Sequence, residues 1–137
     1  MTTVFENKFM VMEYSEDLKF MHHYWLAESS MMQDSDYQES MLAFARIITL
    51  HCPVKMLSDT RNLHFLISVD LQEWGASNPE IFEIRKNVSY VAVLVSSKIF
   101  VEVSVQQAIE EANNEETLIA YFDDKQKAQT WLDSFKI

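Results

Sequence analysis

The polar residues best suited to binding or catalysis follow one apolar run. They are Asp59, Thr60, Arg61, Asn62 and, two positions later, His64. A guanidinium presents its N–H donors in a planar fork, which suits a carboxylate or a phosphate group. A histidine near an aspartate suggests a general base, but such a base needs a fixed acid partner. We therefore predict these five as binding residues. No residue is assigned a catalytic role, because no nucleophile, metal set or cofactor motif accompanies them.

The position of this loop supports a binding role. It follows the predicted strand Val54–Leu57 and precedes a helical segment. Ligands and partners of open α/β sheets bind where strands end and helices begin. A second interpretation stays open, in which Asp59 and Arg61 pair with each other or cap backbone groups of the loop.

The remaining histidines and the single cysteine favour structural roles. His22 and His23 are adjacent in a predicted strand, so their side chains point to opposite faces and cannot easily share a metal ion. His51 and Cys52 form a weak pair at a predicted helix end. Gly75 is the only glycine, which excludes the usual glycine-rich phosphate loops. We predict no metal and no cofactor.

Composition narrows the classes of partner and compartment. The chain has 11 basic and 21 acidic residues and a formal charge of −10, which disfavours nucleic acid and anionic membrane surfaces. No apolar run approaches the roughly 20 residues of a membrane-spanning helix. The lone Cys52 and the lack of a charged-then-apolar leader favour the reducing cytoplasm. Residues 1–137 are expected to form a single domain.

The first half of the chain predicts two strands, a helix and a third strand. Strands over 4–14 and 18–25 form an antiparallel pair. Capping boxes at Ser35 and Asp36 start a helix that runs to about His51, where Pro53 biases Cys52 out of helical geometry. A strand follows at 54–57.

The second half alternates between helices and strands. Ser68 caps a short helix that ends near Gly75, and Asn78 caps the next. The β-branched stretch Val88–Val95 predicts a buried strand at the centre of the sheet, with Val91, Val93 and Leu94 inside. A helix over Val101–Ala112, a strand over Thr117–Phe122 and a helix capped by Asp123 complete the chain.

This alternation predicts the α/β class with a single mixed sheet, in which an N-terminal antiparallel strand pair is followed by parallel strands with helical crossovers.

The order of elements, the phrase Leu57-Ser58-Asp59-Thr60-Arg61-Asn62 and the closing Tyr121-Phe122-Asp123-Asp124 resemble the STAS-like superfamily. Its members include small bacterial relatives of the sporulation anti-sigma-factor antagonists, and the fold is distantly similar to that of CRAL-TRIO lipid carriers. In the antagonists this loop reads Asp-Ser-Ser-Gly, and phosphorylation of the second Ser switches off binding of a kinase partner. Asp59 and Thr60 match the first two positions, whereas Arg61 replaces the phosphoacceptor and Asn62 the Gly.

The resemblance implies a non-enzymatic regulatory or protein-interaction domain that lacks the usual phosphoacceptor serine. The alternative is a carrier of a small apolar or amphipathic ligand, which an enclosed apolar cavity next to Arg61 would favour. An enzyme that uses His64 with Asp59 ranks third. The expected partner is a protein or a small apolar or anionic ligand, and a homodimer is compatible with the sequence.

Overall fold

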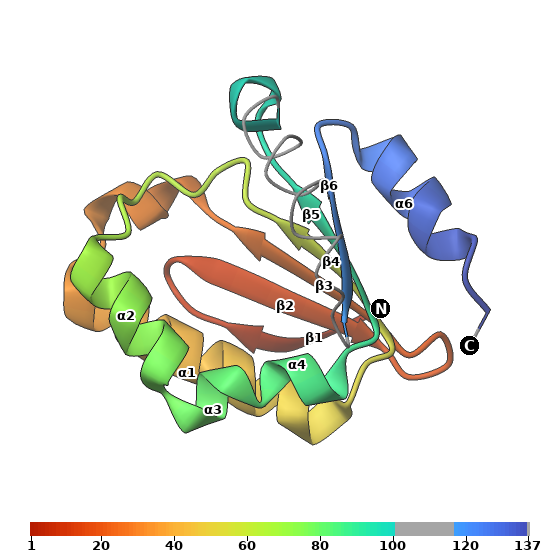
Figure 1. Cartoon of the computed structure of the whole chain (residues 1–137), viewed down its shortest axis with the longest axis horizontal. Coiled ribbons are helices and arrows are strands. Elements are labelled where there is room, and N and C mark those ends of the chain that lie inside the picture. Colours follow the sequence, from red (N-terminus) through yellow and green to blue (C-terminus); the bar gives the residue numbers. More distant parts are fainter. Residues whose placement is uncertain (101–116, 137) are drawn as a thin grey trace.

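The computed structural model describes residues 1–100 and 117–136, and the strands in this part of the chain form one six-stranded sheet. The strands lie side by side in the order in which they occur along the chain, β1-β2-β3-β4-β5-β6 (Figure 1). β1, β2 and β3 pair antiparallel, and β3, β4, β5 and β6 pair parallel. The predicted α/β class with a mixed sheet is confirmed.

The antiparallel part is a meander of three strands, β1 (Thr2–Glu6), β2 (Met10–Ser15) and β3 (Phe20–Trp25). The sequence predicts one strand over 4–14, but a turn at Asn7 divides this stretch. Oδ1 of Asn7 accepts hydrogen bonds from the backbone N–H groups of Phe9 (2.8 Å) and Met10 (2.9 Å). Asparagine side chains commonly turn the chain in this way. The predicted strand pair is therefore three strands.

The parallel part adds three strands to β3, namely β4 (Lys55–Asp59), β5 (Tyr90–Leu94) and β6 (Leu118–Phe122). Helical segments connect or follow them: η1 (Ala27–Met31), α1 (Asp34–His51), α2 (Val69–Ser77), α3 (Pro79–Phe82), α4 (Ile84–Asn87) and α6 (Lys125–Asp133). η1 and α1 link β3 to β4, and α2, α3 and α4 link β4 to β5. Such crossovers are needed because parallel neighbours cannot be joined by a tight turn.

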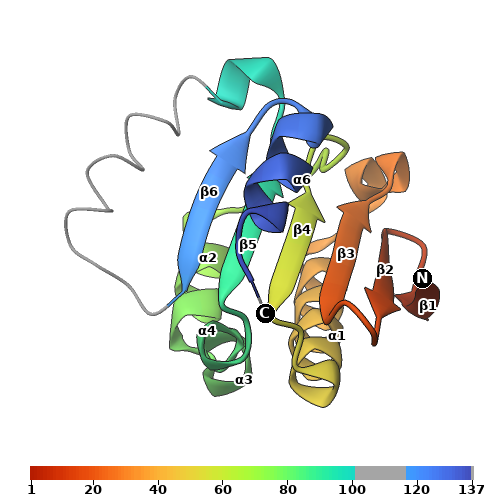
Figure 2. The same cartoon turned by 90° about the vertical axis from the view of Figure 1, so that its right-hand side faces the viewer.

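The helices cover the two faces of the sheet differently. α1 packs on one face, over a core that includes Met12, Met21, Phe44, Ile48 and Met56. α6 packs on the opposite face against β4, β5 and β6, over the smaller core Leu57, Ala92, Leu94, Ala128 and Leu132 (Figure 2). On this second face, no helix of the described residues covers β2 and β3 (Figure 2). Side chains of β2 and β3 that point to this face are therefore more accessible to a partner.

The chain beyond α6 is held against the start of β4. Lys55 is buried, and its Nζ donates a hydrogen bond to the backbone oxygen of Phe135. The ring of Phe135 stacks on Tyr90, with 4.0 Å between the ring centroids. An ammonium group, a carbonyl group and two aromatic rings thus fix the C-terminal segment to the sheet.

Several predicted helix caps are present. The hydroxyl of Ser68 accepts a hydrogen bond from the backbone N–H of Leu71 (3.2 Å), and Oδ1 of Asn78 accepts one from the N–H of Glu80 (3.0 Å). Cys52, directly before the proline, has a φ of 48° in the left-handed region. The end of α1 is therefore where the proline predicts it.

Other helix boundaries differ from the prediction. α1 begins at Asp34, because Gln33 is its N-cap and exchanges capping hydrogen bonds with Asp36. Likewise, Asp124 rather than Asp123 caps α6, since its side chain accepts from the N–H of Lys127 (3.0 Å). In both cases several residues that can cap a helix are adjacent in the sequence, so the pattern alone does not fix the first residue of the helix.

The Val-rich strand is an interior strand but not the central one. β5 lies between β4 and β6, and β6 is at the edge of the sheet. Val91 and Leu94 are buried as predicted, whereas Val93 is only half-buried. Residues 97–100 are helical, and the predicted helix over Val101–Ala112 lies outside the described residues. Among the helices that are described, none has the length and apolar character needed to cross a membrane.

Candidate functional site

The predicted polar loop begins two residues later than expected, because Ser58 and Asp59 are the last residues of β4. Thr60 then ties the loop to the neighbouring strand. Both its backbone N–H (2.8 Å) and its hydroxyl (2.9 Å) donate to the backbone oxygen of Leu94, at the end of β5. The loop therefore starts from a fixed point where the carboxyl ends of β4 and β5 meet.

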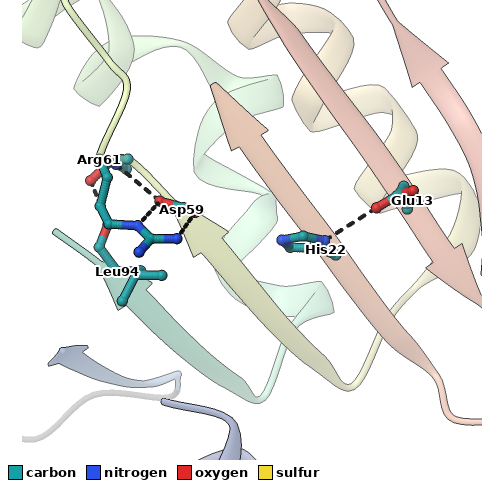
Figure 3. Close-up of polar contacts among 6 residues, drawn as sticks. Glu13, His22, Asp59, Arg61 and Leu94 are labelled. Carbon is teal, nitrogen blue, oxygen red and sulfur yellow. Dashed lines mark hydrogen bonds and ion pairs between the residues drawn. The ribbon is translucent and has the colours of Figure 1, made fainter. Parts of the chain in front are cut away.

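Asp59 and Arg61 pair with each other (Figure 3). Oδ1 of Asp59 accepts from the backbone N–H and from Nε of Arg61, both at 3.0 Å, and Oδ2 accepts from Nη2 at 2.8 Å. The Asp59 side chain is 16% exposed and that of Arg61 is 44% exposed. The pairing that the sequence left open is thus present. Arg61 keeps further N–H donors for a partner, since a guanidinium has five.

The pair shifts the pKa of both groups. Burial alone raises the pKa of Asp59, but the hydrogen bonds and positive charge of Arg61 outweigh it, and the pKa of Asp59 lies below its ordinary value. The hydrogen bond to Asp59 raises the pKa of Arg61, and the charge of Asp124 acts in the same direction. The N-terminus of α6 is therefore electrostatically coupled to the loop.

A buried serine fixes the next turn of the loop. Ser29 of η1 is fully buried, and its hydroxyl donates to the backbone oxygen of Asn62 (3.0 Å) and accepts from the N–H of His64 (2.9 Å). The side chains of Asn62 and His64 are left exposed. No hydrogen bond among the described residues joins His64 to Asp59, whose carboxylate is occupied by Arg61.

Between His64 and α2 the chain alternates between half-buried and exposed side chains. Phe65 points inward and stacks on Tyr37 of α1, with 5.4 Å between the ring centroids. Leu66, the next residue, is 90% exposed, and Val69 at the start of α2 is 68% exposed. The loop is therefore anchored by aromatic packing while it presents aliphatic side chains to the outside.

A second polar pair lies on the face of the sheet to which Asp59 belongs. Glu13 of β2 and His22 of β3 are opposite each other in the hairpin, and Nδ1 of His22 lies 3.2 Å from Oε1 of Glu13 (Figure 3). Tyr24 pairs with Asp59 in the parallel register, so His22, two residues before Tyr24, shares the face of Asp59. The His22 ring thus lies between Glu13 and the loop.

Several charges surround His22. Burial lowers the pKa of His22, its hydrogen bond to the Glu13 carboxylate opposes this, and the charge of Lys125 lowers the pKa further. The Glu13–His22 pair was not predicted from the sequence. The hairpin could have revealed it, because a turn centred between Asp17 and Leu18 places position 13 opposite position 22.

His23 points to the other face, as the alternation of a strand predicts. It is 2% exposed, its Nδ1 lies 3.0 Å from the hydroxyl of Ser58, and its ring is 4.6 Å from that of Phe44. Burial first, and the neighbouring His22 second, lower the pKa of His23 to about 3. His23 is therefore a neutral core residue.

A pocket of about 390 Å³ lies elsewhere, between α1 and α3. Its walls are Ala45, Arg46, Thr49, Leu50, Glu80 and Glu83. Arg46 and Glu80 form an exposed ion pair across it, with Nε and Oε2 2.8 Å apart. In the described parts of the chain, no group of three or more His, Cys, Asp or Glu side chains is arranged to hold a metal ion.

Comparison with protein-family models, with curated proteins and with solved structures finds no match to this chain.

Proposed function

We propose that this protein is a non-enzymatic regulatory or protein-interaction domain, which binds a partner protein through the loop after β4. The observation that carries the proposal is the exposure of Leu66, at 90%, on a loop that is fixed on both sides of it. A large aliphatic side chain that is held out on a preorganised loop can contact a partner with little loss of ordering entropy on association.

The fixed points come from three different elements. Thr60 is bonded to β5, Ser29 of η1 holds the backbone at Asn62 and His64, and Ser68 caps α2. A loop that served only as a connection would not need to hold its apolar side chains away from the core. Leu66 is therefore available as an anchor for a partner.

The resemblance to the anti-sigma-factor antagonists extends this proposal to regulation. In this chain the phosphoacceptor position is Arg61, which is paired with Asp59, and the hydroxyl of Thr60 donates to Leu94. We propose that the loop carries a permanent ion pair in place of a phosphorylation switch. Partner binding would then respond to partner concentration rather than to a kinase.

The observations that bear on the other hypotheses do not favour them. A carrier needs an enclosed apolar cavity, whereas the pocket between α1 and α3 is open and is bordered by the Arg46–Glu80 ion pair. An enzyme that uses His64 needs the carboxylate of Asp59, which is engaged with Arg61. A cytoplasmic location remains part of the proposal, together with the absence of nucleic-acid binding that the charge of −10 suggests.

The test is affinity capture with the purified protein from an extract of the cells that produce it. Leu66→Asp should abolish capture of the partner. Leu18→Asp is the matched control, because Leu18 is also exposed, at 62%, but lies in the β2–β3 turn. Capture of the same proteins by wild type and by Leu66→Asp would contradict the proposal, as would a retained small ligand in native mass spectrometry.

A further inference from the structure

The ring of His22 lies between two carboxylates on one face of the sheet. Nδ1 of His22 is 3.2 Å from Oε1 of Glu13, on the neighbouring strand β2. On the other side, Asp59 of β4 pairs with Tyr24, so Asp59 lies diagonally across from His22 on the same face. Figure 3 shows the ring between Glu13 and the Asp59–Arg61 pair. The position of the ring thus relates it to both carboxylates.

The two ring nitrogens of His22 differ in what they contact. An ionised carboxylate only accepts hydrogen bonds, so Nδ1 carries the proton that is donated to Glu13, and Nε2 of the neutral ring is an acceptor. Nε2 is buried and has no hydrogen-bond partner in the described part of the chain. A second proton on the ring therefore adds at Nε2, where it creates a buried, charged donor that needs an acceptor.

The titratable and charged groups that face His22 come from the strands beside it and from α6. They are Glu13 of β2, Tyr24 of β3, Asp59 of β4 and Lys125 of α6. Burial lowers the pKa of His22, the hydrogen bond to Glu13 opposes this, and the charge of Lys125 lowers the pKa further. His22 is therefore neutral near neutral pH and takes up its second proton below the ordinary value of 6.5.

Asp59 is an acceptor that stays ionised over this range of pH. Burial raises the pKa of Asp59, but the hydrogen bonds and charge of Arg61 outweigh it and hold the pKa below its ordinary value. Arg61 is 44% exposed and can bond to water instead of the carboxylate, whereas Nε2 of His22 is shielded from water. An exposed ion pair contributes little, and a buried charged donor without an acceptor is costly. Burial thus favours His22 over Arg61 as the partner of Asp59 once His22 is charged.

We propose that His22 and Asp59 form a proton-operated switch, in which protonation of Nε2 of His22 draws the Asp59 carboxylate away from Arg61 and frees the guanidinium. The proton comes from water, and the hydrogen bond from Nδ1 to Glu13 is kept in both states. The loop stays anchored, because the hydrogen bonds from Thr60 to β5 do not involve the carboxylate. At neutral pH the Asp59–Arg61 pair is intact, so the switch adds a response to acid and does not depend on the proposed function.

The test is a pH titration of the isotope-labelled full chain by NMR, from about pH 8 to about pH 5. The Cε1–H signal of His22 reports its protonation. The Nε–H signal of Arg61 reports the ion pair, because this group donates to Oδ1 of Asp59. Both signals should change with one midpoint below pH 6.5, and the Arg61 signal should move towards its position in Asp59→Ala, where the pair is absent.

Variants test whether the Arg61 signal follows the charge of His22. Glu13→Gln removes a charge that favours the protonated ring and should lower both midpoints, whereas Lys125→Gln removes an opposing charge and should raise both. Lys125 is exposed, so its replacement should leave the fold intact. His22→Gln should abolish the change at Arg61. His64→Gln is the matched control, since it removes a histidine from the same loop and should leave the change in place.

The contrary results are distinct. The inference is overturned if the Arg61 signal stays constant while His22 takes up its proton, or if the two midpoints do not move together in Lys125→Gln. It is also overturned if the Arg61 change persists in His22→Gln or is lost in His64→Gln. A His22 ring that remains neutral until circular dichroism shows unfolding would overturn it as well.

Discussion

The buried histidine His23 should make the stability of this protein depend on pH. The pKa of His23 in the folded chain, about 3, lies below the ordinary value of 6.5. Between these two pH values the ring is therefore protonated in the unfolded chain and neutral in the folded chain. The stabilising effect is complete above about pH 6.5 and is lost progressively as pH falls from there towards the folded value. Acidification therefore favours the unfolded state well before most carboxylates are protonated.

The size of the effect follows from the two pKa values. At about pH 5, a group with an ordinary pKa of 6.5 is almost fully protonated when unfolded, whereas His23 in the folded chain is almost fully neutral. The difference amounts to about 2 kcal/mol relative to about pH 8. His22, whose pKa burial also lowers, adds to the loss in the same direction.

The assay is urea unfolding at about pH 8 and about pH 5, followed by far-ultraviolet circular dichroism. His23→Leu removes the titrating ring and fills the same space, so it should reduce the pH-dependent loss by about 2 kcal/mol. Ile48→Val is the matched control, since Ile48 is fully buried in the same core. It should lower the free energy of unfolding by about 1 kcal/mol equally at both pH values.

An equal loss of stability in wild type and His23→Leu between the two pH values would contradict this prediction. The prediction also fails if an NMR titration of the folded protein shows that the ring of His23 takes up a proton near pH 6.5. Either result would mean that solvent or a carboxylate reaches Nε2 of His23, which has no hydrogen-bond partner among the described residues.

Three further predictions concern the loop and the C-terminal contact. Arg61→Ala should lower the free energy of unfolding by less than about 1 kcal/mol, as expected for an exposed ion pair. Asp59→Ala should lower it more, because it also leaves the backbone N–H of Arg61 without its partner. Chemical denaturation of the two variants compares these effects. Ser29→Ala should cost about 2 kcal/mol and speed hydrogen exchange at the amide of His64. Lys55→Met should leave the thermal midpoint unchanged or raised, since it removes a buried charge.

Each of these predictions has an outcome that contradicts it. If Arg61→Ala lowered the free energy of unfolding as much as truncation of a core side chain, the role of Arg61 would be structural. Unchanged exchange at His64 after Ser29→Ala would show that the serine does not hold the loop. A lowered melting temperature for Lys55→Met would show that its bond to Phe135 contributes more than burial of the ammonium group costs.

Local chemistry explains what could be predicted from the sequence. The caps at Ser68 and Asn78 and the end of α1 at Cys52 involve residues a few positions apart, so their geometry depends little on the rest of the fold. The Val-rich strand was recognisable because its stretch, Val88–Val95, is uncharged and interrupted only by Ser89. Its place next to the edge strand depends on how the sheet is ordered, which the stretch itself does not encode.

Contacts between distant residues account for what could not be predicted. From the sequence Ser58 is expected in the loop, yet it belongs to β4, where it pairs with His23 of β3 and Val93 of β5, each 35 positions away. Asn7 interrupts an otherwise regular apolar pattern through bonds of its own side chain, and its Nδ2 also donates to Ser40 of α1 (3.0 Å). Within the candidate site, the pairing of Asp59 with Arg61 was among the interpretations left open, whereas the Glu13–His22 pair required the hairpin register.

The strand order has a consequence for how this protein is made. Each strand of the described sheet pairs with the strand that precedes it in the chain, so no strand has to enter between two that are already joined. The sheet can therefore grow in the direction of synthesis, strand by strand, as the chain leaves the ribosome. Until the next strand is complete, however, the last parallel strand formed has an open edge, which another chain could pair with.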